Sequence, residues 1–130
     1  MKGQWNANDR ELAEIEYIAN GDLDTPVLMI NIAKYNDGKY PKGKAYQGYM
    51  KILTQILDEV GGKLLWQLPA LSQPVGSQAA EEILGFCYPS HKSFLALPTA
   101  PSSVENFRIK NFCVSEAVIQ RFPADIISVN

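Results

Sequence analysis

The stretch from Val27 to Tyr35, VLMINIAKY, constrains the fold most, because it is apolar on both sides. Successive side chains of a β-strand point to opposite faces of the sheet. One face would carry Val27, Met29 and Ala33, and the other would carry Leu28, Ile30 and Ile32. A strand of this kind is usually buried on both sides. Any fold that the chain adopts must therefore cover both faces of the sheet that contains this strand.

Three further strands are expected from the pattern of apolar residues. They are Lys63–Leu68, with Leu64, Trp66 and Leu68 on one face, then Glu81–Tyr88, and finally Ala117–Phe122. Pro69 and Pro74 follow the first of these strands. Because proline cannot donate a hydrogen bond to a neighbouring strand, this strand is expected near an edge of the sheet.

The strongest helical pattern covers Lys44–Val60, where apolar residues recur at spacings of three and four and Gly61-Gly62 ends the helix. A helix is also expected after Asn8, because Asn8 and Glu11 have the spacing of a capping box. Ser102 and Glu105 have the same spacing and predict another helix. Residues 107–115 fit either a helix or a strand, and the helix is favoured.

The order of these elements predicts an α+β fold. After the first helix comes strand-helix-strand-strand-helix-strand, which is the ferredoxin-like βαββαβ arrangement. That arrangement has a four-stranded antiparallel sheet with both helices on one face. We expect residues 1–24 to form an N-terminal helical extension and residues 25–130 to form the ferredoxin-like domain.

The other face of such a sheet would be bare, although its strands are apolar. Monomers rarely expose a large apolar patch. A second copy packed sheet against sheet across a two-fold axis would cover this face. The sequence therefore predicts a homodimer, which makes the fold a dimeric α+β barrel.

Composition excludes several classes of function. The formal net charge is −2, with 12 Lys+Arg against 14 Asp+Glu and no basic run, so we expect no nucleic-acid partner. The apolar runs are too short for a membrane span, and the N-terminus has no hydrophobic signal core, so we expect no membrane association and a cytoplasmic location.

Cys87 and Cys113 are expected to be buried free thiols. No cluster of residues has metal-ligand spacing, so we expect neither a metal nor another cofactor.

Several segments resemble a known family. PVLMINIAKY, YQGYM, GGKLLW, PVG and EEILGFCYPSHKSFLAL, in this order, are similar to the family called domain of unknown function 1330, within the dimeric α+β barrel superfamily. The similarity covers about Pro26 to Phe122. It implies the fold and the dimer, but the family has no general assigned reaction. Members usually have a His-Arg pair in the last helix, where this chain has Arg108 without a histidine.

The candidate ligand-binding residues are polar or aromatic groups in otherwise apolar elements. The space between the sheet and its helices often holds a ligand in this fold, and aromatic walls with a few polar tips suit a small apolar molecule. Asn31 is either a polar anchor there or a structural hydrogen-bonding group. Arg108 is either near the mouth of this pocket or in a surface salt bridge. The candidates are Asn31, Tyr35, Tyr46, Tyr49, Trp66, Tyr88 and Arg108.

His91 is the only histidine and follows Ser90, which is expected to cap a short helix. The first turn of a helix is a common solvated position, and the sequence shows no carboxylate partner for the imidazole. We therefore expect His91 to be a surface residue without a role, and its change to alanine to be nearly neutral.

Three functions stay open at this point, and no catalytic residue can be named. The first is a homodimer that binds a small apolar or aromatic molecule between sheet and helices. The second is a cofactor-independent enzyme of the monooxygenase or isomerase kind. The third is a structural dimer without a ligand. A polar-lined cavity between sheet and helices would favour the first two.

Overall fold

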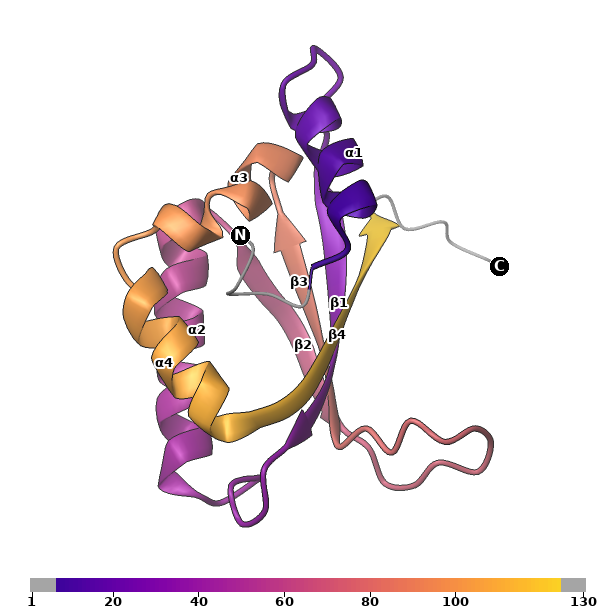
Figure 1. Ribbon diagram of the computed structural model, residues 1–130, viewed down its shortest axis with the longest axis vertical. Coiled ribbons are helices and arrows are strands. Elements are labelled where there is room, and N and C mark those ends of the chain that lie inside the picture. Colours follow the sequence, from indigo (N-terminus) through magenta and orange to yellow (C-terminus); the bar gives the residue numbers. More distant parts are fainter. Residues whose placement is uncertain (1–6, 125–130) are drawn as a thin grey trace.

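The computed structural model of the protein describes residues 7–124. The chain forms one four-stranded sheet with helices packed against it (Figure 1). In chain order the elements are α1 (Asp9–Ala19), β1 (Val27–Tyr35), α2 (Lys44–Val60), β2 (Lys63–Pro69), β3 (Glu82–Tyr88), α3 (His91–Leu95), the 3₁₀ helix η1 (Leu97–Thr99), α4 (Ser103–Cys113) and β4 (Val114–Pro123).

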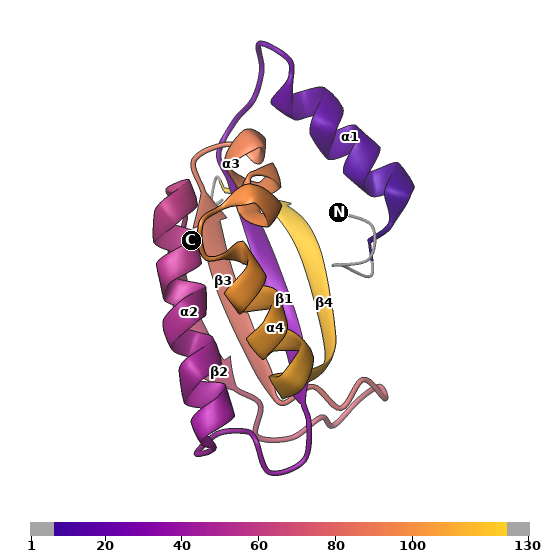
Figure 2. The same ribbon diagram turned by 60° about the vertical axis from the view of Figure 1, so that its left-hand side comes forward.

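The sheet has the order β2-β3-β1-β4, and its three strand pairs are all antiparallel. Helices α2 and α4 lie side by side on the same face (Figure 2). This is the ferredoxin-like α+β fold that the order of the elements predicts. The two-sided apolar strand β1 lies in the middle of the sheet, and β2 is an edge strand, as its flanking prolines indicate.

The core lies between the sheet and the two long helices. Met29 and Phe86 face the helices from the central strands, and both are almost fully buried. Helix α2 contributes the buried stripe Tyr46, Tyr49, Leu53, Ile56 and Leu57. It ends at Gly61, whose φ of +81° favours glycine, as the Gly-Gly pair predicts.

Residues 107–113 are helical, and β4 begins immediately after them at Val114, three residues before the expected start of the last strand. The two expected capping boxes do not form, because neither Asn8 nor Ser102 accepts a capping hydrogen bond with its side chain. Ser102 instead binds Glu59 of α2 through both its backbone N–H and its hydroxyl. This contact joins α4 to α2 where the sequence indicated a contact within one helix.

Strand β2 contains an irregularity between Leu64 and Trp66 that the sequence did not predict. Leu64 pairs with Phe86 and packs on the core, whereas Trp66 pairs with Gly85. A Cβ atom added to Gly85 would lie 2.5 Å from the Trp66 ring, so the indole covers this glycine on the face away from the helices. The expectations that Leu64 and Trp66 share a face, and that Trp66 lies between sheet and helices, are therefore wrong.

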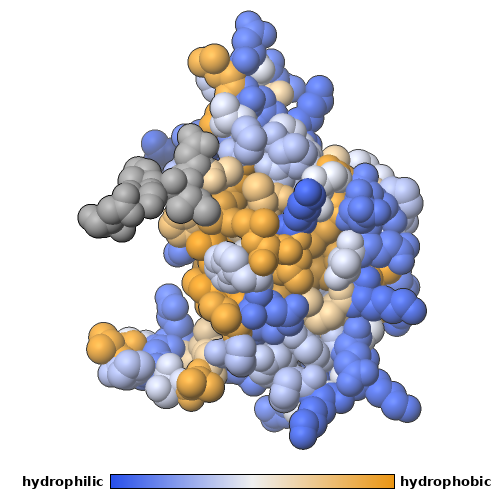
Figure 3. Space-filling view, turned by 180° about the vertical axis from the view of Figure 1, so that it is seen from behind, coloured by the Kyte–Doolittle hydropathy of each residue, from blue (hydrophilic) through white to orange (hydrophobic). Residues whose placement is uncertain are grey.

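The face of the sheet away from the helices is apolar. Figure 3 shows hydrophobic side chains gathered on the side of the molecule opposite to the view of Figure 1. The strand registers assign to this face Leu28, Ile30, Ile32, Trp66, Leu68, Ile83, Cys87, Val118 and Phe122. Leu68 is 55% exposed, and the others are half-buried or exposed. No described element covers this face.

Candidate functional site

A small cavity of about 40 Å³ lies between the sheet and helices α2 and α4. Asn31 of β1, Tyr49 of α2 and Tyr88 of β3 line it, so the fold brings three of the sequence-predicted candidates together. Asn106 of α4 lines the opposite wall and was not predicted. The helical period of α4 could have identified Asn106, because Phe107 and Cys113 of that helix are buried with it.

The two asparagines share an unusual property. The amide oxygens of Asn31 and Asn106 are both buried and have no hydrogen-bond partner among the described residues. Nearly all buried polar groups in proteins are hydrogen-bonded, and an unpaired one costs about 1–3 kcal/mol. Two such acceptors in one cavity are therefore available to a hydrogen-bond donor that residues 7–124 do not supply, such as water or a ligand.

The cavity adjoins a larger cleft of about 440 Å³ between α1 and the sheet. Phe94, Lys110 and Ile119 line both spaces, so the larger cleft borders the cavity that contains the two asparagines. Leu12 and Ile15 of α1 and Met29 of β1 give the cleft an apolar wall. Burial lowers the pKa of Lys110 from its ordinary value, because desolvation disfavours the charged ammonium group. The volume of the larger cleft falls in the usual range for a small-molecule site.

Tyr35 and Tyr46 do not line this cavity. Their hydroxyls donate to the carboxylate of Glu82, at 2.5 Å and 2.6 Å, and Gln67 donates to the same carboxylate at 3.2 Å. Glu82 is only 2% exposed. Burial and the neighbouring carboxylate both raise the pKa values of the two tyrosines, because each disfavours a phenolate. This group has its hydrogen bonds satisfied internally and is a structural network.

Arg108 lies on the surface of α4, away from the cavity. Its guanidinium donates to Glu105 one turn earlier, with a distance of 3.0 Å from Nε. The side chain of Arg108 is largely exposed. Of the two alternatives for this residue, the surface salt bridge is the one observed.

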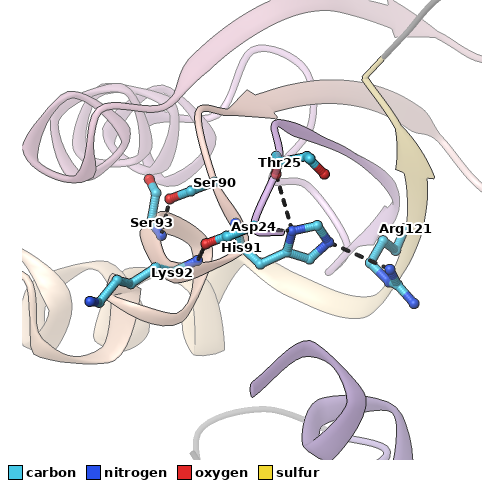
Figure 4. A network of polar contacts seen from close by, with 7 residues as sticks. All are labelled: Asp24, Thr25, Ser90, His91, Lys92, Ser93 and Arg121. Atoms are coloured by element: carbon cyan, nitrogen blue, oxygen red, sulfur yellow. Dashed lines mark hydrogen bonds and ion pairs between the residues drawn. The ribbon is translucent and has the colours of Figure 1, made fainter. Parts of the chain in front are cut away.

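The expectation for His91 is wrong, because this residue is buried and bonded. It is 4% exposed. Its Nδ1 lies 2.9 Å from Oδ1 of Asp24 and 3.1 Å from the carbonyl oxygen of Thr25 (Figure 4). Its Nε2 points toward Arg121 at the end of β4. The partner carboxylate comes from the linker after α1, 67 residues earlier in the chain, so no local pattern could reveal it.

Asp24 also binds the first turn of α3. Its two carboxylate oxygens accept hydrogen bonds from the backbone N–H groups of His91 and Lys92, at 2.7 Å and 3.1 Å. Desolvation by burial acts to raise the pKa of Asp24, but the hydrogen bonds from these two amides and the His91 ring outweigh it and lower the pKa. Ser90 accepts from the backbone N–H of Ser93, which is the helix cap that the sequence predicts.

Within residues 7–124, no group of three or more His, Cys, Asp or Glu side chains is arranged to hold a metal ion. None of the helices in this range is long and apolar enough to cross a membrane.

Comparison with solved structures supports the fold. A protein of unknown function from Rhodopseudomonas palustris is similar, with a TM-score of 0.73 and 21% identity over 94% of this chain and 97% of the other. A protein from Arabidopsis thaliana gives a TM-score of 0.62 and 14% identity, over 79% of this chain and 99% of the other. A dabb family protein with a ferredoxin-like fold from Mesorhizobium loti gives a TM-score of 0.57 and 9% identity, over 82% of this chain and 99% of the other.

No model of a known protein family matches the chain, and no curated protein matches it. At these identities the similarity to solved structures establishes the ferredoxin-like fold alone.

Proposed function

We propose that the protein is a homodimer that binds a small molecule between its sheet and its helices. The observation that carries this proposal is that the amide oxygens of Asn31 and Asn106, which have no partner within residues 7–124, lie in one cavity. A purely structural dimer would gain stability from an apolar residue at either position. A binding site needs such groups, because they fix the orientation of the ligand.

The lining of the two spaces defines the chemistry of the ligand. The inner cavity presents two acceptors, so the inner end of the ligand carries an O–H or N–H donor. The outer cleft has an apolar side, formed in part by Leu12, Ile15 and Ile119, and the apolar or aromatic body of the ligand lies against this side. Its other side is polar and includes Glu11, Lys110 and Gln120. A phenol has both properties. This chemistry agrees with the small apolar or aromatic ligand that the sequence predicts.

The homodimer rests on the apolar face of the sheet. Ile30 lies at its centre, with Gly85 beside it on one neighbouring strand and Gln120 on the other. Two such faces packed at the usual separation of about 10 Å would remove the patch from water. The similarity to the domain of unknown function 1330 family, within the dimeric α+β barrel superfamily, leads to the same arrangement, and membership in that family remains part of this proposal.

A matched pair of probes tests the ligand site. We expect para-butylphenol to bind about tenfold more tightly than para-butylanisole, because only the phenol can donate a hydrogen bond to the asparagine oxygens. Calorimetry gives the affinities, and amide chemical shifts locate the binding near Asn31 and Asn106. Asn31→Leu should remove the preference for the phenol. Equal affinity for the two probes, or an unchanged preference in Asn31→Leu, would contradict the proposal.

A further inference from the structure

A second cleft, separate from the asparagine cavity, lies beside the C-terminal end of α1. It has a volume of about 1020 Å³ and is lined by the linker after α1 and by the end of β4. Tyr17, Ile18 and Phe122 form part of an apolar wall. His91 and Arg121 also line it, and Asn31, Tyr49 and Asn106 do not. Arg121 also lines the outer cleft of the proposed phenol site, but His91 and the linker after α1 do not, so the phenol site does not account for this cleft.

The surroundings of His91 determine which of its ring nitrogens carries the proton. The two oxygens near Nδ1, from the Asp24 carboxylate and the Thr25 carbonyl, can only accept hydrogen bonds. Nδ1 therefore carries a proton and donates. In the neutral imidazole, Nε2 then has a lone pair, and this lone pair is directed toward Arg121 (Figure 4).

The contacts of the Arg121 guanidinium with described residues are long. Nη1 lies 3.5 Å from Nε2 of His91, and Nη2 lies 3.4 Å from Oε1 of Glu14 on α1. Good hydrogen bonds from nitrogen to oxygen measure about 2.7–3.2 Å. Arg121 therefore retains most of its capacity to donate, next to a nitrogen that can accept.

From this geometry we propose that the second cleft binds an α-hydroxy carboxylate. The guanidinium of Arg121 holds the carboxylate, for which its planar pair of donors is suited. The neighbouring hydroxyl of the ligand donates to Nε2 of His91. An apolar or aromatic substituent lies against Tyr17 and Ile18 of α1.

Three carboxylates lie near this site and affect the affinity. The Asp24 carboxylate accepts hydrogen bonds from three donors, the backbone N–H groups of His91 and Lys92 and the His91 ring, which stabilise its charge. Asp22 lines the cleft but is exposed, so water and salt screen its charge. Glu14 is also exposed and contacts Arg121 directly. The ligand carboxylate therefore competes with Glu14 for the guanidinium.

Three related compounds test the proposal on the full chain. We expect phenyllactate to bind about tenfold more tightly than phenylpropionate, which lacks the hydroxyl, and more tightly than phenylpropanediol, which lacks the carboxylate. Amide chemical shifts should change near His91 and Arg121. The Asn31→Leu variant should bind phenyllactate as the wild type does, which distinguishes this cleft from the phenol site.

Two variants separate this site from nonspecific binding. Arg121→Gln should weaken phenyllactate binding about tenfold or more while circular dichroism shows an unchanged fold. Glu14→Gln should tighten binding about two- to fivefold, because it removes the competing carboxylate. Glu16→Gln is the matched control on the same helix and should not reproduce that gain. The proposal is overturned if phenyllactate does not bind at millimolar concentration, or if neither Arg121→Gln nor Glu14→Gln changes its affinity.

Discussion

Replacing Asn31 with leucine should stabilise the protein, although it changes a half-buried residue in the central strand of the sheet. The amide oxygen of Asn31 is buried without a partner among the described residues, and its removal recovers a desolvation cost of about 1–3 kcal/mol. Filling the adjoining cavity of about 40 Å³ adds about 1 kcal/mol, at roughly 24 cal/mol per Å³. Steric strain from the larger side chain offsets about 1–3 kcal/mol. We expect a net gain of about 1 kcal/mol.

Thermal and urea unfolding at a fixed protein concentration measure this gain. For a domain of this size the melting temperature should rise by about 3–6 °C. Asn36→Leu is the matched control, because the amide of Asn36 does make a hydrogen bond, at 2.8 Å to the carbonyl oxygen of Phe112. That variant should lose about 0.5–1.5 kcal/mol. A loss of more than about 1 kcal/mol in Asn31→Leu would refute the reasoning, since it would mean that the amide has a structural role.

Three further predictions concern the rest of the molecule. Tyr46→Phe should destabilise the protein by about 1.5–3 kcal/mol through the lost hydrogen bond to the Glu82 carboxylate, while Tyr40→Phe should stay within about 0.5 kcal/mol, both by urea unfolding. Burial raises the pKa of Tyr35, Tyr46, Tyr49 and Tyr88 in the folded protein. The free energy of unfolding should therefore be at its full value below a pH of about 10, the ordinary tyrosine pKa in the unfolded chain, and should fall as the pH rises above this value. An unchanged free energy of unfolding at high pH would contradict this. Ile30→Glu should convert a dimer of twice 14.4 kDa into a monomer in sedimentation equilibrium, and a monomeric wild type would refute the dimer.

The fold could be predicted because its signals are local. The period of the apolar residues in Lys44–Val60 and the two-sided apolar pattern of Val27–Tyr35 depend only on neighbouring residues, and both elements have the expected bounds. The cap of α3 by Ser90 is also a local contact. Sheet topology then follows from a small number of allowed connections.

The errors share a different cause, because each depends on contacts between distant segments or on an irregular backbone. His91 is buried by Asp24, which no spacing rule connects to it. Trp66 lies on the other face because β2 is irregular beside Leu64, and an irregularity of one residue moves every later side chain to the opposite face. Tyr46 belongs to the core network because Glu82 faces inward.

Asn31 shows how an apparent defect in a strand can indicate function. Its neighbours on the same face, Met29 and Ala33, are buried and apolar, and local rules favour a third apolar residue between them. Asn106 makes the same exception on α4, with no sequence relation to Asn31. The fold brings the two amide oxygens, neither of which has a partner in the described part of the chain, to one cavity. Two independent costs of this kind at one point are difficult to explain by stability, since either could be removed by a single substitution. Because residues that break local rules tend to mark functional sites, this cavity is a stronger candidate for ligand binding than the fully satisfied network around Glu82.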